Sequence, residues 1–372
     1  MSRTTGGGEL RTVDDLDTVV EADGHVTAPA PMLLPYMDAE FDDVREFYER
    51  SPNGSLEFSA ASVASPLYLY ERMKEREGKE GFSFGRPSDA GDLLEVMEEH
   101  GIDRAIANNL GFSPRRNPRH AAGLVNAYNN WVREEFDDYP NIYANMLGTP
   151  LDPEFTAAEI ERMGDHDSTV GVQLLGTLLR PLPGDPQYDP VWEAASAHDL
   201  PVAIHTGTGP RSFPKQFWSA ETYAEDHVSA HPMLHMSILT SFVFKGVFER
   251  FPDLTIVMQE AGIGYLPYLK QRMDAAYAEL GYEVPGVTRP PSEYLDEHVY
   301  FCTQPLGHTH GTPEHLAWLV EMAGIDNLLW SADVPHPDFD TPEELFNRVK
   351  PYFSAAELNK VMGKNAERVF GI

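Results

Sequence analysis

Short apolar runs rich in β-branched residues recur along the chain and alternate with longer amphipathic stretches. Runs of this kind are typical of parallel strands that are buried on both faces. We predict strands at Thr18–Asp23, Arg104–Asn108, Ile142–Leu147, Val170–Leu175, Pro201–His205, Leu254–Glu260, His298–Thr303 and Asn327–Asp333. Helical patterns stand between them, at Asp92–His100, Val191–His198 and Pro313–Ala323 among others.

This alternation favours a closed (β/α)8 barrel over an open, doubly wound sheet. The glycine-rich fingerprint of a dinucleotide-binding sheet follows none of the predicted strands, which weakens the open-sheet alternative. We therefore predict an α/β fold, a TIM-type barrel, as a single domain over residues 17–372. A flexible tail over residues 1–16 would precede it.

The connection between the first two predicted strands is much longer than one crossover helix needs. It contains Phe47, Tyr48 and the tract ASPLYLYERM, so we expect an ordered insertion over residues 26–100. Because this segment follows the C-terminal end of a strand, we expect it to lie over the barrel mouth as a lid.

Composition and charge limit the class of partner. A formal net charge of −31 argues against nucleic acids and anionic membranes, which both require a basic surface. The single cysteine, Cys302, excludes an intramolecular disulfide and a cysteine-based zinc site. No apolar run approaches the roughly 20 residues that span a bilayer, and the polar N-terminus does not resemble a secretory signal. We expect a cytoplasmic homo-oligomer, a dimer, that acts on a small molecule.

Residues that can bind a metal stand at the ends of three predicted strands. The first strand leads into Asp23-Gly24-His25, whose two polar side chains point to the same side because residues two apart on a strand do so. The fifth strand ends in His205 and the eighth in Asp333. Taken singly, each residue has a structural explanation as a core histidine or a turn cap. Their coincidence at one face of a barrel predicts one divalent ion, Zn²⁺ or Mn²⁺, held by all four.

Four longer motifs point to a family. They are VVEADGHVTAP, PVAIHTGTG, FKGVFERFPDLTIVMQEAGIGYLPYLKQRMD and NLLWSADVPHPDF. Together they resemble the amidohydrolase-related family of the aminocarboxymuconate-semialdehyde decarboxylase type, within the amidohydrolase superfamily. The resemblance implies that the first-strand motif and His205 supply metal ligands. It also implies that Asp333 is a ligand or a proton donor.

The chain departs from that family pattern at two positions. The first-strand motif is Asp-x-His, where His-x-His or Glu-x-His is frequent, and Glu260-Ala261-Gly262 stands where a histidine followed by glycines is frequent. Carboxylates in place of imidazoles favour a harder ion such as Mn²⁺. We predict that Glu260 is an active-site group, as a base, a partner of a ligand or a ligand. The alternative is that it caps the following helix.

Three further residues are candidates for substrate binding. His231 and His235 share a face if their segment is helical, and we assign His231 to the pocket and His235 to packing. Arg211 could grip a substrate carboxylate, or be an ordinary surface charge. His336 could orient Asp333, or stabilise the turn that contains it.

These residues predict a metal-dependent carboxy-lyase, a non-oxidative decarboxylase, acting on a small aromatic or unsaturated carboxylic acid. Asp333 would deliver a proton to the carbon that loses CO2, and His205 would hold or polarise the substrate. The alternative is a metal-dependent hydrolase of an ester, lactone or amide, with Asp333 taking a proton from a metal-activated water. A non-catalytic barrel is a third reading, disfavoured by the intact ligand set.

The net charge of −31 has two explanations, a surface adapted to high salt or an ordinary acidic protein. If the first holds, the melting temperature should rise from low salt into the molar range, because added ions screen the repulsion between carboxylates. Thermal unfolding at increasing NaCl concentration measures this. A melting temperature that stays flat or falls leaves the ordinary explanation.

Overall fold

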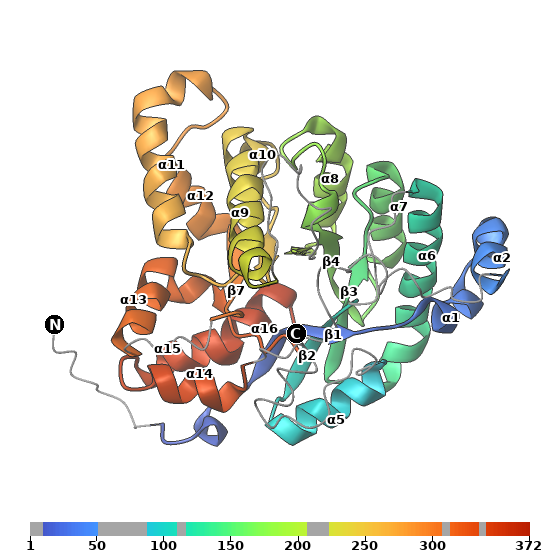
Figure 1. Ribbon diagram of the computed structural model, residues 1–372, viewed down its shortest axis with the longest axis horizontal. Coiled ribbons are helices and arrows are strands. Elements are labelled where there is room, and N and C mark those ends of the chain that lie inside the picture. Colours follow the sequence, from blue (N-terminus) through green and yellow to red (C-terminus); the bar gives the residue numbers. More distant parts are fainter. Residues whose placement is uncertain (1–9, 51–87, 110–116, 207–222, 307–312, 335–339) are drawn as a thin grey trace.

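The computed structural model describes residues 10–50, 88–109, 117–206, 223–306, 313–334 and 340–372 (Figure 1). Eight parallel strands form one sheet in which neighbours follow chain order. They are β1 (Val20–Val26), β2 (Arg104–Asn109), β3 (Ile142–Leu147), β4 (Thr169–Leu175), β5 (Val202–His205), β6 (Ile256–Gln259), β7 (Val299–Cys302) and β8 (Leu328–Leu329).

Backbone hydrogen bonds bring the two edges of this sheet together. The N–H of Ala22 on β1 donates to the carbonyl of Trp330 over 3.3 Å, and the N–H of His25 donates to the carbonyl of Val334 over 2.9 Å. The chain just after β8 therefore lies beside β1, and the predicted (β/α)8 barrel is confirmed.

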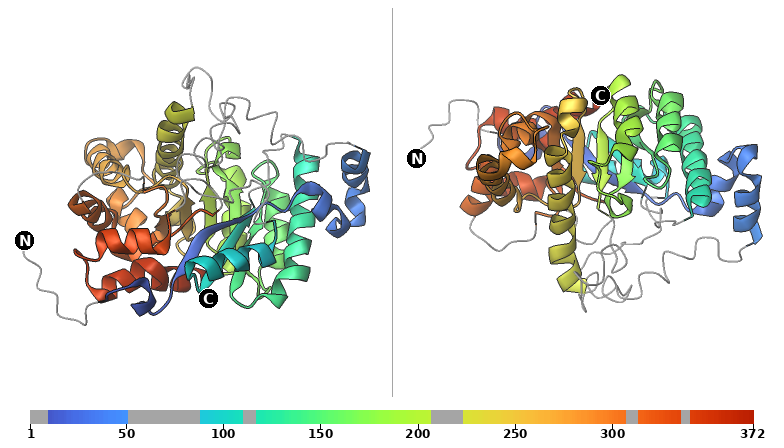
Figure 2. Two further views of the ribbon diagram at one scale, coloured as in Figure 1. Left: turned by 60° about the horizontal axis from the view of Figure 1, so that its bottom comes forward. Right: turned by 90° about the horizontal axis from the view of Figure 1, so that it is seen from above.

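Helices lie on the outer side of the strands (Figures 1 and 2). Those before the fifth strand are α1 (Ala30–Leu33), α2 (Asp42–Arg50), α5 (Ala90–His100), α6 (Pro118–Glu135), α7 (Pro153–Met163) and α8 (Asp189–Ala197). The later ones are α9 (Tyr223–Phe244), α10 (Val247–Arg250), α11 (Leu266–Leu280), α12 (Pro291–His298), α13 (Pro313–Ala323), α14 (Pro342–Val349), α15 (Ala355–Asn359) and α16 (Asn365–Phe370). Among the described helices, none combines the length and apolar character needed to cross a membrane.

Local sequence signals begin and end several of these helices. The side chain of Asp89 accepts a hydrogen bond from the N–H of Asp92 at the start of α5, and Gly101 ends that helix with φ of 67°. Thr341 and Glu344 form a reciprocal capping box at the start of α14. Such caps satisfy backbone groups that a helix end leaves without an intrahelical partner.

The barrel interior changes from apolar to polar along the strands. Residues two apart on a strand share a face, so neighbouring layers of the interior can be read from the sequence. An apolar side chain of the inner core is followed two positions later by a buried polar one on three strands. The pairs are Ile106 and Asn108 on β2, Ala203 and His205 on β5, and Val257 and Gln259 on β6. The polar layer therefore lies at the C-terminal ends of the strands.

Only the strand predicted at Ile142–Leu147 has the bounds that the structure shows, and the two largest differences, at β1 and β8, concern the candidate site. β1 extends to Val26, so that His25 lies within the strand, and its register against β2 shifts between Glu21 and Gly24. β8 is only Leu328–Leu329, because the next N–H, that of Trp330, donates to the carbonyl of Val361. Asp333 consequently lies in the chain beyond the strand.

The long β1–β2 connection is described in part. Its first helices, α1 and α2, pack beside α6, and its last, α5, packs against β1 and β2 (Figure 2). Residues 51–87 lie outside those that the structure describes, as do residues 1–9 of the predicted tail. The lid over the barrel mouth and the domain bounds therefore stay predictions.

Candidate active site

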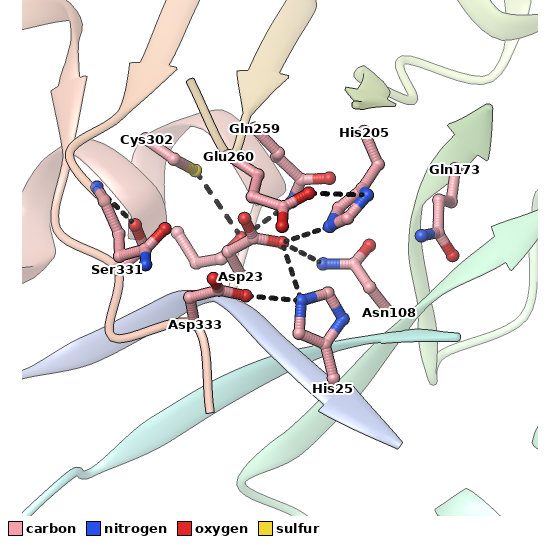
Figure 3. Close-up of polar contacts among 12 residues, drawn as sticks. Asp23, His25, Asn108, Gln173, His205, Gln259, Glu260, Cys302, Ser331 and Asp333 are labelled. Carbon is pink, nitrogen blue, oxygen red and sulfur yellow. Dashed lines mark hydrogen bonds and ion pairs between the residues drawn. The ribbon is translucent and has the colours of Figure 1, made fainter. Parts of the chain in front are cut away.

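The four predicted metal ligands meet at the C-terminal ends of the strands (Figure 3). Each of them offers one ligand atom, and these atoms all lie within 4.8 Å of one another. The Oδ1 atom of Asp23 lies 3.9 Å from Nε2 of His25 and 3.9 Å from Nε2 of His205. Nε2 of His25 lies 2.7 Å from Oδ1 of Asp333. All four side chains are buried, and we call them the quartet.

The quartet fits a divalent cation. Asp23 Oδ2 is buried and has no hydrogen-bond partner among the described residues. Burial raises the pKa of Asp23 well above its usual value, and the negative charges of Asp333, Glu260 and Glu21 raise it further. A cation among these groups would reverse that penalty. Two imidazoles and two carboxylates are donors that Zn²⁺ and Mn²⁺ accept.

A chain of side-chain amides positions Asp23. The amide of Asn108 on β2 donates to Asp23 Oδ1 over 2.9 Å, and that of Asn145 on β3 donates to Asn108 Oδ1 over 2.8 Å. Both asparagines are buried. Sequence reasoning missed them, although a polar residue in an otherwise apolar strand was a signal that could have found them.

Glu21, also missed, joins β1, which carries Asp23, to the segment after β8 that carries Asp333. Its Oε1 accepts the N–H of Asp23 over 2.8 Å and its Oε2 accepts the N–H of Ala332 over 2.6 Å. The next residue, Asp333, has φ of 61°. This left-handed conformation is unfavourable for any residue that has a side chain. Burial raises the pKa of Glu21 to about 8. The carboxylate therefore holds the backbone on both sides of the quartet.

Glu260 lies against the outer nitrogen of His205. Its Oε2 is 3.5 Å from Nδ1 of His205 and accepts a hydrogen bond from the hydroxyl of Thr206. A carboxylate on that side favours the tautomer with hydrogen on Nδ1, which leaves Nε2 directed at Asp23. Glu260 does not cap α11, whose N-cap residue is Tyr265. Of the predicted alternatives, a partner of a ligand fits this geometry best.

The histidine pair lies on α9, as a shared helical face requires. Both side chains are buried, and Nδ1 of His235 lies 3.1 Å from the hydroxyl of Tyr265. Burial lowers the pKa of His235 to about 3, helped by the charges of His231 and His205. His235 is therefore a neutral, packed residue, while the assignment of His231 to the pocket stays a prediction. Arg211 and His336 lie outside the described residues.

Sequence comparison identifies the family to which this barrel belongs. Residues 81–372 match the profile of the family described as Amidohydrolase. The chain belongs to the amidohydrolase family. This membership makes the protein an enzyme and confirms the resemblance that the four motifs indicated.

Two relatives that are similar in sequence are named as decarboxylases. "Decarboxylase orsB" of Emericella nidulans is 24% identical over 247 residues, covering 61% of this chain and 70% of the relative. The 2-amino-3-carboxymuconate-6-semialdehyde decarboxylase of Dictyostelium discoideum is 23% identical over 261 residues, covering 68% of each.

Solved structures share the fold. The 5-carboxyvanillate decarboxylase LigW from Sphingomonas paucimobilis has a TM-score of 0.71 at 20% identity, covering 95% of this chain and 99% of that one. An amidohydrolase from Mycobacterium avium subsp. paratuberculosis has a TM-score of 0.72 at 20% identity, covering 96% and 100%. A 5-carboxyvanillate decarboxylase from Novosphingobium aromaticivorans, solved with manganese, has a TM-score of 0.67 at 20% identity, covering 99% and 100%.

Loss of either imidazole of the quartet should abolish metal binding. We expect the wild-type protein to hold one equivalent of Zn²⁺ or Mn²⁺, and His25→Ala and His205→Ala to hold almost none, because each removes a direct donor. Elemental analysis of dialysed protein measures this. His198→Ala, which removes a histidine that pairs with Glu161 and Asp165 and is not one of the quartet, is the matched control and should keep the metal. Full metal content in both test variants would contradict the assignment.

Replacing Glu21 with Gln should loosen the quartet without removing a ligand. The amide has one acceptor oxygen where two N–H groups need acceptors, so we expect stability to fall by about 1–3 kcal/mol. Metal affinity should fall with it. Chemical denaturation and metal titration measure the two effects, with Glu98→Gln on the exposed side of α5 as control. Unchanged metal affinity would show that Glu21 does not position the site.

Proposed function

We propose that this amidohydrolase-family enzyme is a metal-dependent, non-oxidative decarboxylase of a small aromatic or unsaturated carboxylic acid. The observation that carries the proposal is the buried quartet at the barrel mouth. The relatives and structural neighbours named as decarboxylases support this reading over hydrolysis. Asp23, His25, His205 and Asp333 would hold one Zn²⁺ or Mn²⁺ ion. When bound, that ion would supply the positive charge that attracts the substrate carboxylate and a neighbouring oxygen.

Asp333 is the residue we assign to proton transfer. It reaches the quartet from a loop, since β8 ends at Leu329, and its Oδ1 is 2.7 Å from His25 Nε2. In its protonated form it would donate a proton to the carbon that bears the carboxylate. The bond from that carbon to the carboxylate then breaks, CO2 leaves, and Asp333 regains a proton from water.

His205 and Glu260 act together in this proposal. Glu260 on the Nδ1 side of His205 fixes the orientation of the imidazole, and Nε2 remains on the side of the quartet. His205 therefore holds or polarises the substrate from a fixed position. His231, buried on α9, together with Arg211 and His336, stays proposed for substrate binding.

Three broader expectations also remain proposals. A small-molecule substrate is supported by membership of an enzyme family and by a relative that is named for a small carboxylic acid. A cytoplasmic location and a homodimer are proposed on the sequence alone. Light scattering of the purified protein would test the dimer.

The choice between decarboxylation and hydrolysis is tested by product. Metal-loaded protein is incubated with a panel of hydroxybenzoates and a panel of lactones, and release of CO2 and release of acid are followed separately. We expect CO2 from at least one hydroxybenzoate and no acid from the lactones. Acid release without CO2 would instead support the hydrolase, in which Asp333 takes a proton from a metal-activated water.

Asp333→Asn and Glu260→Gln should differ in the size of their effects. Asn keeps the shape and a ligand oxygen but removes the proton donor, so we expect retained metal and turnover lowered by roughly 10² or more. Glu260→Gln should cost less, because that residue orients a ligand. Steady-state kinetics and metal analysis of both variants measure this. Near-normal activity of Asp333→Asn beside an inactive Glu260→Gln would reverse the two roles.

A further inference from the structure

β1 carries two members of the quartet, and its pattern of inward-facing residues changes just before them. Val20 and Ala22 belong to the apolar inner core of the barrel, two positions apart as a regular strand requires. Asp23 and His25 nevertheless face the same interior, where they meet the rest of the quartet (Figure 3). The alternation of the strand is therefore broken between Ala22 and Asp23. In an unbroken strand, both ligands would face the helices outside the barrel.

Backbone pairing locates the same break. The register of β1 against β2 shifts between Glu21 and Gly24. On the other side of β1, the N–H groups of Ala22 and His25 both donate to the segment after β8. Residues of a regular strand bond alternately to one neighbour and the other, so a spacing of three positions requires an extra residue. β1 thus contains a bulge, a feature that re-aims side chains next to active sites.

The peptide at the bulge, between Ala22 and Asp23, is held by side chains at both of its polar groups. Oε1 of Glu21 accepts its N–H, that of Asp23, over 2.8 Å. Nε2 of Gln259 donates to its carbonyl, that of Ala22, over 3.0 Å. The thiol of Cys302, a weaker donor, also lies 3.8 Å from this carbonyl. Because Gln259 is the last residue of β6, its bond reaches the peptide from across the barrel.

Gln259 is well placed to fix this peptide. Its side chain is buried, and it pairs with the ligand His205 in the register of β5 and β6, so it lies at the level of the quartet (Figure 3). A carbonyl oxygen can only accept a hydrogen bond, so the nitrogen of the amide must face Ala22. Loss of this donor would deprive a buried carbonyl of its amide partner, which is costly away from water.

We propose that Gln259 is a positioning residue of the metal centre, which holds the β1 bulge in the conformation that turns Asp23 and His25 inward. Gln259 and Glu21 bind opposite ends of one peptide, so they oppose rotation of that peptide from both sides. Such a rotation would move the carboxylate of Asp23. The inference rests on the part of the proposed function that assigns an ion to the quartet, and it does not depend on the reaction. Gln259 acts through the ligands without contact with the substrate.

The test is metal affinity, measured by titrating metal-free protein with Mn²⁺ and with Zn²⁺. Gln259→Met keeps the length of the side chain and removes the donor. We expect its affinity to fall about tenfold to a hundredfold, the usual effect of losing a group that orients a ligand. Asn327→Leu is the matched control, because it removes a buried amide that donates to the carbonyls of Asp296 and Val299, just before β7 and at its start. It should lower the melting temperature and leave the metal affinity nearly unchanged.

A double variant shows whether the two side chains act on one peptide. Glu21→Gln combined with Gln259→Met should lose less affinity than the product of the two single losses, because either change already frees the bulge. Gln259→Asn, whose amide is one methylene group too short to reach Ala22, serves if the methionine variant does not fold.

The outcomes separate this inference from the proposed function. Wild-type affinity in the folded Gln259 variant, or single losses that multiply in the double variant, overturns the inference alone. A wild-type protein that binds neither ion overturns the metal assignment and this inference with it. Metal binding that depends on Gln259, in a protein that releases no CO2, supports the inference and overturns only the proposed reaction.

Discussion

A concentration of buried negative charge is the constraint on which the site depends. Glu21, Asp23, Glu260 and Asp333 are all buried within one cluster of contacts. A carboxylate removed from water strongly disfavours its charged form unless a neighbour compensates it. The raised pKa values of Asp23 and Glu21 express that penalty. The buried polar residues of the described chain include no lysine and no arginine, so no described residue of either type relieves it. A divalent metal ion held by Asp23, His25, His205 and Asp333 would supply the compensating positive charge.

Uncharged donors supply the rest of the stabilisation. The amide of Asn145 donates to Asn108, whose own amide donates to Asp23. The N–H groups of Asp23 and Ala332 donate to Glu21, and the hydroxyl of Thr206 donates to Glu260. These dipoles hold each oxygen in place without cancelling its charge. The cluster therefore keeps its attraction for a cation while its geometry is set by β1, β2 and β3. The same arrangement explains why the polar layer lies directly above the apolar inner core.

The sequence predicts the ligands better than their supports, for a physical reason. Strand ends of a parallel barrel converge, so Asp23, His25 and His205 could be grouped from local pattern alone. The role of Glu21 depends on which backbone groups meet where the barrel closes. Those groups are far apart in the sequence, so local pattern does not reveal them. Asp333 was placed on a strand because its neighbours are apolar, but the Trp330 N–H bonds to Val361 and ends β8 early.

Backbone conformation explains how two acidic groups come to face the centre of the barrel. Glu260 and Asp333 follow the sixth and eighth strands, and both adopt left-handed φ values, 63° and 61°. Along a regular strand, side chains alternate between the two faces of the sheet. A left-handed residue directly after the strand breaks this alternation and changes the direction of its side chain. Each such residue costs of order 1–3 kcal/mol, and the surrounding hydrogen bonds must hold it. Glu21 holds the segment before Asp333 by accepting the N–H of Ala332. The two strained residues are thus the carboxylates that follow their strands and still reach the neighbouring imidazoles.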